Sequence, residues 1–116
     1  MADKMKYLLG IDFGGGASKA TLLREDGEIT ATATYEYPTL YPKPGWTEQD
    51  PEDWVKATVS NIKAVLEKSK VNPADIAAVS MDAATHTAVI MDENFNVLRP
   101  AIYWTDTRSV DEVSYL

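Results

Sequence analysis

Three consecutive glycines, Gly14 to Gly16, follow a short apolar segment that ends in the carboxylate Asp12. Glycines between two strands let backbone N–H groups converge on an anion such as phosphate, because no side chain blocks its approach. A carboxylate beside such a loop is compatible with phosphate if Mg²⁺ is also bound, since Mg²⁺ takes oxygen ligands from carboxylates, water and phosphate. The same glycines could instead form only a tight hairpin that needs positive φ angles. The residues alone leave both interpretations open.

The two familiar phosphate-binding glycine motifs do not fit this loop. The pattern GxxxxGK[ST] is absent, because Ala-Ser-Lys follows Gly16 at the wrong spacing. The dinucleotide fingerprint needs a third glycine and then a helix, whereas this sequence has Lys19 at that position and continues as an extended apolar segment. We therefore expect a hairpin loop between two strands.

The composition of the 116 residues narrows the function classes. A net charge of −7, with 11 basic and 18 acidic residues, argues against a nucleic-acid groove, which needs basic surface. The chain has no cysteine, which excludes disulfides and thiolate metal sites. It has no run of about 18 apolar residues that could span a membrane and no signal-peptide pattern at its start. We expect a soluble cytoplasmic protein that binds neither nucleic acid nor membrane.

The elements that must position the glycine loop are three strands and a helix. Residues 6–12 and 19–24 are short apolar segments, and Asp26-Gly27 between residues 24 and 28 is a hairpin turn signal. Residues 28–37 alternate, with Ile29, Ala31, Ala33, Tyr35 and Tyr37 on one face. These three segments predict an antiparallel meander.

A helix is predicted after a proline-rich loop at residues 38–49. Asp50 is a suitable N-cap and Pro51 a suitable first helical residue, and the helix should end near residues 68–70. Its core-facing side is predicted to be Trp54, Thr58, Ile62, Val65 and Leu66.

The rest of the chain predicts further strands and a second helix. Residues 76–81 and 87–91 should form a fourth and a fifth strand, with a turn at residues 92–96. Residues 97–104 should be extended, and residues 109–116 should begin a helix. The order of elements indicates one α/β domain with a mixed sheet over residues 1–116.

Four stretches together resemble the N-terminal part of the FGGY carbohydrate kinases, nearest to the xylulokinase-like branch. They are GIDFGGGASKATLL, the Asp-Gly turn, GWTEQDPEDW and RPAIYWTDTRS. The resemblance implies the RNase H-like fold of the actin/Hsp70/hexokinase superfamily, of which this chain would be part of the N-terminal lobe. It implies ATP-dependent phosphorylation of a sugar or polyol hydroxyl, a pentulose such as xylulose being nearest. The resemblance also allows the complete protein to form a homodimer.

On this resemblance, the nucleotide side of the site contains Asp12 and the glycine loop. Asp12 would hold Mg²⁺, while Gly14, Gly15 and Gly16 would face the ATP phosphates, although the family more often has Thr or Ser at Gly15. Lys19 matches a commonly basic position, and a surface lysine at a strand edge is the alternative. The general-base Asp is expected beyond residue 116, together with the C-terminal lobe, so the isolated chain is expected to be inactive.

The sugar side would be formed by Asp82, Trp104 and Asp106. Met81-Asp82-Ala83 is aligned with a Met-His-Gly-like stretch of the family, with Asp82 in place of the His. Trp104 would pack on the carbon skeleton of the substrate, and Asp106 would accept a hydrogen bond from a hydroxyl. Arg108 is expected to pair with Asp106 or Asp82. The only histidine, His86, is expected to be structural and to lie at the start of a strand.

Two other functions remain as alternatives at this point. One is a non-catalytic, nucleotide-dependent interaction domain of the actin or Hsp70 type, which would not need Asp82, Trp104 and Asp106. The other is a substrate-binding module without turnover. Trp46, Trp54 and the Glu-Gln-Asp stretch are expected to be structural and to clamp the proline-rich loop onto the helix.

Overall fold

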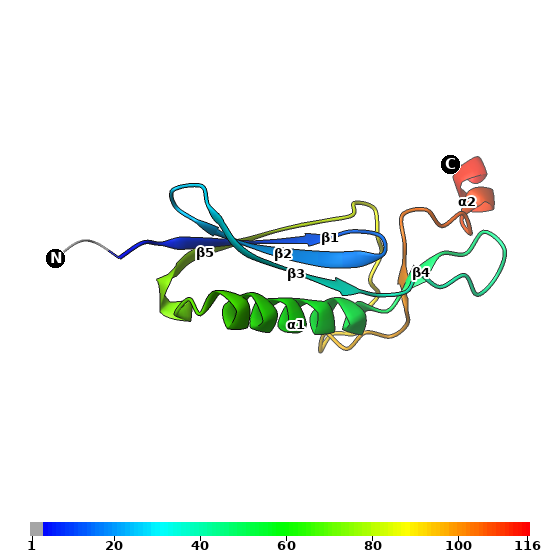
Figure 1. Cartoon of the computed structure of the whole chain (residues 1–116). Helices are drawn as coiled ribbons and strands as arrows, with labels where there is room; N and C mark the ends of the chain where they lie inside the picture. Colours follow the sequence, from blue (N-terminus) through cyan, green and yellow to red (C-terminus); the bar gives the residue numbers. More distant parts are fainter. Residues whose placement is uncertain (1–3) are drawn as a thin grey trace.

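A four-stranded mixed sheet forms the main body of the computed structural model, which describes residues 4–116 (Figure 1). The first three strands form the predicted antiparallel meander, and the fourth strand of the sheet pairs with β1 in parallel. The strand order is β3-β2-β1-β5. The prediction of a mixed α/β sheet is confirmed. The bounds are β1 Tyr7–Phe13, β2 Ala17–Arg24, β3 Ile29–Glu36 and β5 Ile76–Ala83.

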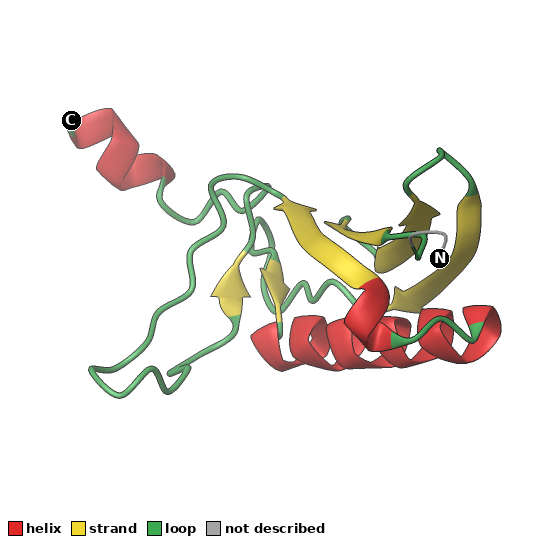
Figure 2. Ribbon diagram, turned by 90° about the vertical axis from the view of Figure 1, so that its left-hand side faces the viewer, coloured by secondary structure: helices red, strands yellow, loops and turns green. Residues whose placement is uncertain are grey.

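The helix α1, Pro51–Ser69, lies along one face of this sheet (Figures 1 and 2). The predicted cap is confirmed, because the Asp50 side chain accepts a hydrogen bond of 3.0 Å from the backbone N–H of Glu52. The helix ends where Lys70 adopts a left-handed conformation with a φ of 59°. A short 3₁₀ turn, Pro73–Asp75, then leads into β5.

The buried face of α1 differs in its centre from the predicted one. Ala57, Asn61 and Val65 are fully buried, whereas Trp54 and Ile62 are only half-buried. The small Ala57 fits close to the sheet, and Asn61 can be buried because its side-chain N–H donates to the Ser18 carbonyl at 3.0 Å. The core between α1 and the sheet consists of Leu9, Ile11, Ala20, Leu22, Ala33 and Val65.

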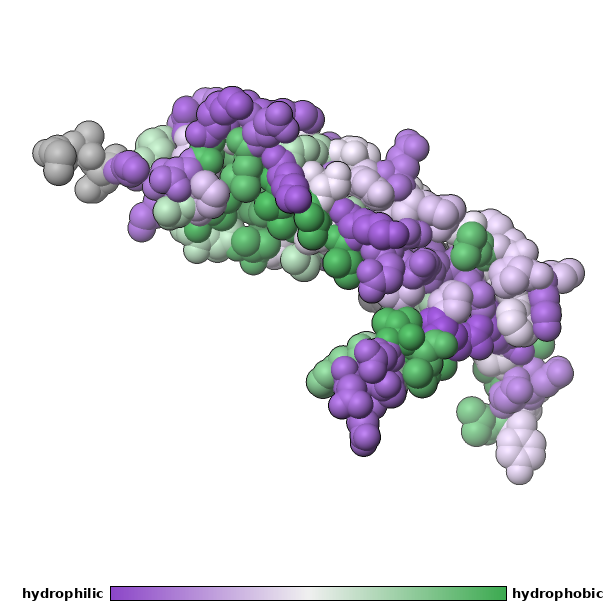
Figure 3. Space-filling model, turned by 90° about the horizontal axis from the view of Figure 1, so that it is seen from below, coloured by the Kyte–Doolittle hydropathy of each residue, from purple (hydrophilic) through white to green (hydrophobic). Residues whose placement is uncertain are grey.

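β5 is one of the two edge strands of the sheet, and its outer side has no strand partner among residues 4–116. Val79 and Met81 pair in register with Leu9 and Ile11, so they lie on the face that α1 covers elsewhere. Both remain more than half exposed, because α1 contacts β2 and β3 instead. An apolar area is accordingly visible on this underside of the molecule (Figure 3).

A second, smaller group of elements lies beyond one end of the sheet, and the molecule extends over 66 Å in its longest direction. Part of the predicted proline-rich loop is in fact a strand, β4 (Glu48–Gln49), which pairs with β6 (Ala101–Ile102). The helix α2, Val110–Tyr115, confirms the prediction for the C-terminal residues and points away from the sheet (Figure 2). In the described part of the chain, no helix is long and apolar enough to cross a membrane.

The prediction of a fifth strand at residues 87–91 is wrong. Only isolated bridges form there, between Ala88 and Ile102 and between Met91 and Val97. The intervening residues have no continuous partner strand, so a short apolar run alone does not produce a ladder. The predicted turn at residues 92–96 is confirmed, since the Asp92 carboxylate accepts hydrogen bonds from the backbone N–H groups of Asn94 and Asn96.

Candidate functional site

The glycine loop joins β1 to β2 as a hairpin, as predicted. None of its three glycines has a φ in the left-handed region, in which Gly27 and Gly45 are the only glycines among residues 4–116. The interpretation that these glycines serve to supply positive φ is therefore not supported. A Cβ atom on Gly14 would approach the Ala17 carbonyl to 3.2 Å, whereas a Cβ on Gly16 would meet no protein atom within 4 Å. The backbone at Gly16 is thus open to a ligand.

The carbonyls of the glycine loop are hydrogen-bonded within the protein, whereas two of its amides are not. The carbonyls of Gly14, Gly15 and Gly16 all accept hydrogen bonds, from Tyr37 and from side chains of the loop that follows β3 and of β4. The N–H of Gly14 donates to the Ala17 carbonyl at 2.9 Å. Within residues 4–116 the N–H groups of Gly15 and Gly16 have no acceptor. Two adjacent free amides are the arrangement that binds an anion.

Three of the predicted residues gather on the sheet face opposite α1. Asp12 pairs in register with Lys19 on β2 and with Asp82 on β5, and all three side chains are exposed. The neighbouring Asp12 carboxyl, as a potential hydrogen-bond partner of the protonated form, raises the pKa of the Asp82 carboxyl, and slight desolvation and the Asp12 charge act in the same direction. Together with Gly10 and Thr21, these residues line a groove of about 270 Å³.

The carboxylates of this groove suit a hard cation. Mg²⁺ is bound in proteins through one or two carboxylates together with phosphate oxygens and water. Asp12 and Asp82 supply two carboxylates, and the glycine loop directly follows the strand that carries Asp12. The donor set therefore fits the predicted metal.

Trp104 and Asp106 follow β6 in the chain, whereas Asp82 lies on β5. No hydrogen bond or ion pair within the described chain joins Asp82 to either of them. Trp104 is 57% exposed, and its ring lies 6.3 Å from that of Tyr103. Asp106 has a side chain that is only 3% exposed, and Arg108 pairs with it at 2.8 Å, which confirms the first of the two expected partners of Arg108.

The carboxylate of Asp106 is fully engaged within the protein. One oxygen accepts from the backbone N–H and the Nε of Arg108, and the other accepts from the Thr47 N–H and from Arg108 Nη2. These bonds, led by that of the Arg108 side chain, hold the pKa of Asp106 well below its usual range. Arg108 also pairs with the buried Glu48 at 2.8 Å and lies over the Trp46 ring, 3.8 Å from its centroid. The predicted structural role of Trp46 is consistent with this contact.

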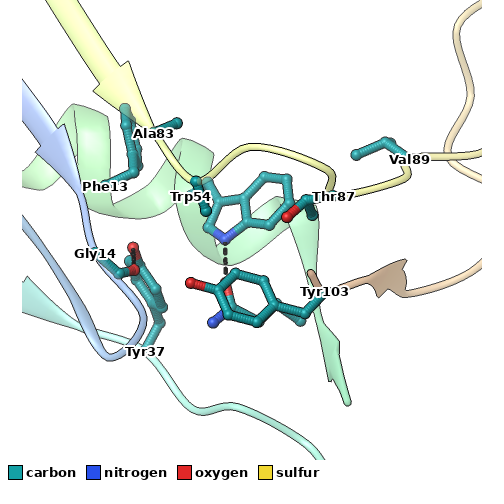
Figure 4. A pocket seen from close by; sticks show the side chains of 10 residues that line it. Phe13, Gly14, Tyr37, Trp54, Ala83, Thr87, Val89 and Tyr103 are labelled. Carbon is teal, nitrogen blue, oxygen red and sulfur yellow. Dashed lines mark hydrogen bonds between the residues drawn. The ribbon is translucent and has the colours of Figure 1, made fainter. Parts of the chain in front are cut away.

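An apolar cavity of about 270 Å³ lies between the glycine loop and the residues that follow β5 (Figure 4). Phe13, Gly14 and Tyr37 line one side, while Trp54 and Tyr103 contribute aromatic rings to the other. Our sequence reasoning assigned no site role to Tyr37 or Tyr103, whose hydroxyl groups lie close to the glycines. The alternation of residues 28–37 did place Tyr37 on the buried face, which was the available signal.

His86 does not lie at the start of a strand, as the sequence had suggested. It occupies an exposed bend after β5, between Ala84 and Thr87, which both line the apolar cavity. Its φ of 55° is uncommon for a residue other than glycine. Backbone outliers often lie at functional sites, so we take the exposed bend with His86 as a candidate, whereas the sequence predicted a structural role for this residue.

Comparison with known proteins assigns this arrangement to a family. A family model described as the N-terminal domain of the FGGY family of carbohydrate kinases matches residues 7–116. The chain belongs to this family. Xylulose kinase of Bacillus subtilis is 38% identical over 108 residues, which are 93% of this chain and 22% of that protein. Glycerol kinase of Thermococcus gammatolerans is 34% identical over 93% of this chain and 22% of that protein.

Solved structures agree with the sequence comparison. Xylulose kinase from Rhodospirillum rubrum has a TM-score of 0.88 and 26% identity over 95% of this FGGY chain and 22% of its own. Gluconate kinase from Lactobacillus acidophilus has a TM-score of 0.87 and 27% identity over 97% of this chain and 22% of its own. The predicted actin/hexokinase-like fold is confirmed. The chain spans less than a quarter of the length of the relatives that it matches.

Proposed function

We propose that this FGGY chain is part of an ATP-dependent carbohydrate kinase and supplies the phosphate loop and part of the sugar site. The observation that carries the proposal is the pair of free N–H groups at Gly15 and Gly16, directly after the strand that bears Asp12. Amides that converge on phosphate and a carboxylate that holds a cation are the parts that phosphoryl transfer requires of a protein, since its catalysis is mainly positioning and charge stabilisation.

On the nucleotide side, the amides of Gly15 and Gly16 bind phosphate oxygens of ATP, and Lys19 adds a positive charge across from Asp12. Asp12 holds Mg²⁺, with Asp82 as its neighbour on β5. When bound, the cation neutralises charge on the phosphates. The role of this chain is to orient the phosphates against the exposed face of the sheet.

On the sugar side, Trp104 offers an exposed aromatic wall for the carbon skeleton of the substrate. Because all the acceptor positions of Asp106 are engaged, we assign it the role of holding the segment that carries Trp104, in place of the predicted contact with a hydroxyl. Asp82 remains the proposed acceptor for a sugar hydroxyl, and the exposed bend with His86 is a further part of the sugar site. A carboxylate at Asp82 favours a neutral sugar over a sugar acid.

We infer that the substrate is a pentulose such as xylulose. Support comes from the relatives named xylulose kinase in B. subtilis and Staphylococcus xylosus, at 38% and 37% identity. The general base is expected outside residues 1–116, so the chain alone should bind Mg-ATP weakly and should not turn over. We place the activity in the cytoplasm, where ATP and free sugars are available.

The test measures Mg-ATP binding by the 116-residue chain with Asp12→Asn as the variant and Asp111→Asn as the matched control. Both substitutions remove one negative charge, but Asp111 lies on the exposed helix α2, far along the chain from the loop. Titration calorimetry with and without Mg²⁺ should show that only Asp12→Asn loses the metal-dependent part of the affinity, by about tenfold for the loss of one charge-assisted contact.

Sugar specificity is tested on the complete protein that carries this segment. ADP release should depend on a pentulose more strongly than on glycerol or gluconate, and Trp104→Ala should raise the KM for the sugar and leave that for ATP unchanged. ATP turnover that is independent of every sugar would favour the nucleotide-dependent interaction domain instead. Equal metal dependence in Asp12→Asn and Asp111→Asn would refute the assignment of Asp12.

A further inference from the structure

Gln49 connects the glycine loop to the first turn of α1. It lies on β4, pairs with Ala101 of β6, and is only 1% exposed. Its Nε2 donates to the Gly15 carbonyl at 2.8 Å, and its Oε1 accepts from the indole N–H of Trp54 at 2.9 Å. Figure 4 shows this last bond beside the apolar cavity. A buried amide side chain therefore spans the distance between a rigid helix and the backbone of the loop.

The orientation of the Gln49 amide follows from the chemistry of its neighbours. The Trp54 indole N–H can only donate, so the group that faces it must be the Oε1 of Gln49. The Gly15 carbonyl can only accept, so the group that faces it must be Nε2. The amide therefore has one favourable orientation, in which its two ends are held by partners of opposite kind.

Thr39 completes the attachment of Gly15. The second N–H of Gln49 Nε2 donates to Thr39 Oγ1 at 3.0 Å, and Thr39 Oγ1 donates to the same Gly15 carbonyl at 3.0 Å. Both lone pairs of the Gly15 carbonyl are thus occupied. The carbonyl is fixed on the protein side of the loop.

Fixing this carbonyl determines where the next amide points. The Gly15 carbonyl and the Gly16 N–H belong to one planar peptide unit and point in opposite directions. When Gln49 and Thr39 hold the carbonyl toward the protein, the Gly16 N–H must face outward, and this is one of the two amides without an acceptor. Tyr37 acts similarly on the preceding unit, since its Oη donates to the Gly14 carbonyl, which shares a peptide unit with the Gly15 N–H.

We propose that Gln49 is a positioning residue for phosphate binding, which aims the Gly16 amide by holding the Gly15 carbonyl. This inference rests on the proposed function in that it takes the glycine loop as the phosphate site. It adds a residue that touches no phosphate and that acts through the backbone. Tyr37 contributes in the same way to the Gly15 amide, and burial raises the pKa of its hydroxyl to about 12, so it remains a donor at neutral pH.

The experiment separates the two hydrogen bonds of Gln49. Gln49→Glu retains an acceptor for Trp54 but loses the donor to Gly15, whereas Trp54→Phe removes the bond to the helix and leaves the donor to Gly15 in place. Gln49→Leu removes both. Thr58→Val is the matched control, because its hydroxyl bonds only to the Trp54 carbonyl within α1 and has no contact with the loop.

Two quantities are measured for each variant of the 116-residue chain: affinity for Mg-ATP by calorimetry, and hydrogen exchange of the Gly15 and Gly16 amides by NMR. We expect Gln49→Leu and Gln49→Glu to bind Mg-ATP about tenfold to a hundredfold more weakly and to change the Gly16 exchange rate and chemical shift. Trp54→Phe should lose much less affinity, and Thr58→Val should match the wild type. Dispersed amide signals from the core strands must remain in each variant.

The outcomes distinguish this inference from the proposed function. If the wild type fails to bind Mg-ATP, the proposed function is wrong for the isolated chain, but the Gly16 signal still reports whether Gln49 sets the loop conformation. If the wild type binds and Gln49→Glu binds equally well with an unchanged Gly16 signal, Gln49 does not position the loop and the inference is wrong. A loss in Trp54→Phe as large as that in Gln49→Glu would also overturn it, because the effect would then not act through Gly15.

Discussion

Leu22 is the position at which the packing of the sheet on α1 can be tested most directly. Its side chain is fully buried on β2, the strand that pairs with β1 on one side and β3 on the other. The next residue, Leu23, is half-buried and points to the opposite face of the sheet, away from α1. The two leucines therefore provide a variant and a control with the same chemistry and nearly the same position.

The expected cost of Leu22→Ala follows from its burial. Removing three carbons loses about 2.4 kcal/mol of transfer free energy, at about 0.8 kcal/mol for each. The cavity left between the sheet and α1 adds to this, which gives a total of about 3–4 kcal/mol within the range known for buried leucines. For a chain of this size, this corresponds to a fall in the thermal midpoint of about 12–24 °C.

The measurement is thermal unfolding followed by circular dichroism, with Leu22→Val as a milder variant. Losing one methylene should cost about 1 kcal/mol, so Leu22→Val remains folded if Leu22→Ala does not. Leu23→Ala should cost less than half as much as Leu22→Ala, because its side chain leaves water only in part. Equal losses for Leu22→Ala and Leu23→Ala would show that α1 does not pack on this face of the sheet.

Two further changes test the region beyond the sheet. Arg108 lowers the pKa of Asp106 in the folded state, so the stabilisation by the Asp106 carboxylate is present at neutral pH and is lost as the pH falls below about 4. The difference in thermal midpoint between the wild type and Asp106→Asn should therefore shrink between about pH 4 and pH 2. A difference that stays constant over this range would contradict the prediction. Gly45→Ala should lower the stability of the fold more than Gly27→Ala, because both glycines have a positive φ but only a Cβ at Gly45 would meet Thr107 Oγ1, at 2.6 Å. Calorimetric unfolding of both variants tests this, and equal losses of stability would mean that Thr107 moves aside.

The parts of the fold that could be predicted from the sequence are those with a local pattern. The alternation of residues 28–37, the Asp26-Gly27 turn and the Asp50-Pro51 helix start each depend on neighbours within a few positions. The structure reproduces all three within one or two residues. Such local patterns predict the elements well because each strand and the helix buries the apolar face that its own sequence defines.

The parts that could not be predicted depend on partners far along the chain. Asn61 and Gln49 are polar residues that are buried because they donate to Ser18 and Gly15, and no hydropathy pattern reveals such bonds. The strand expected at residues 87–91 has a short apolar run but lacks a continuous partner.

The candidate site was predicted in part, for the same reason. The glycine loop and Asp12 were found from their order along the chain, and parallel pairing then brings Asp82 beside Asp12. That pairing depends on the crossover through α1, which a motif alignment does not describe. The expected grouping of Asp82 with Trp104 in one sugar site stays a prediction, since Asp82 lies on β5 and Trp104 follows β6.

The position of β5 at the edge of the sheet links ligand affinity to local unfolding. β5 is held by β1 alone, with its exposed Val79 and Met81 uncovered by α1, so we expect it to detach more easily than the other edge strand, β3, which α1 contacts. That opening separates Asp82 from Asp12, and any ligand that requires both carboxylates binds only the closed form. At a hundred times its dissociation constant, such a ligand would stabilise the docked strand by about 2.7 kcal/mol. Conversely, a partner that covers Val79 and Met81 would favour the docked form of β5. It would thereby strengthen cation binding at the opposite face of the sheet without contacting the cation.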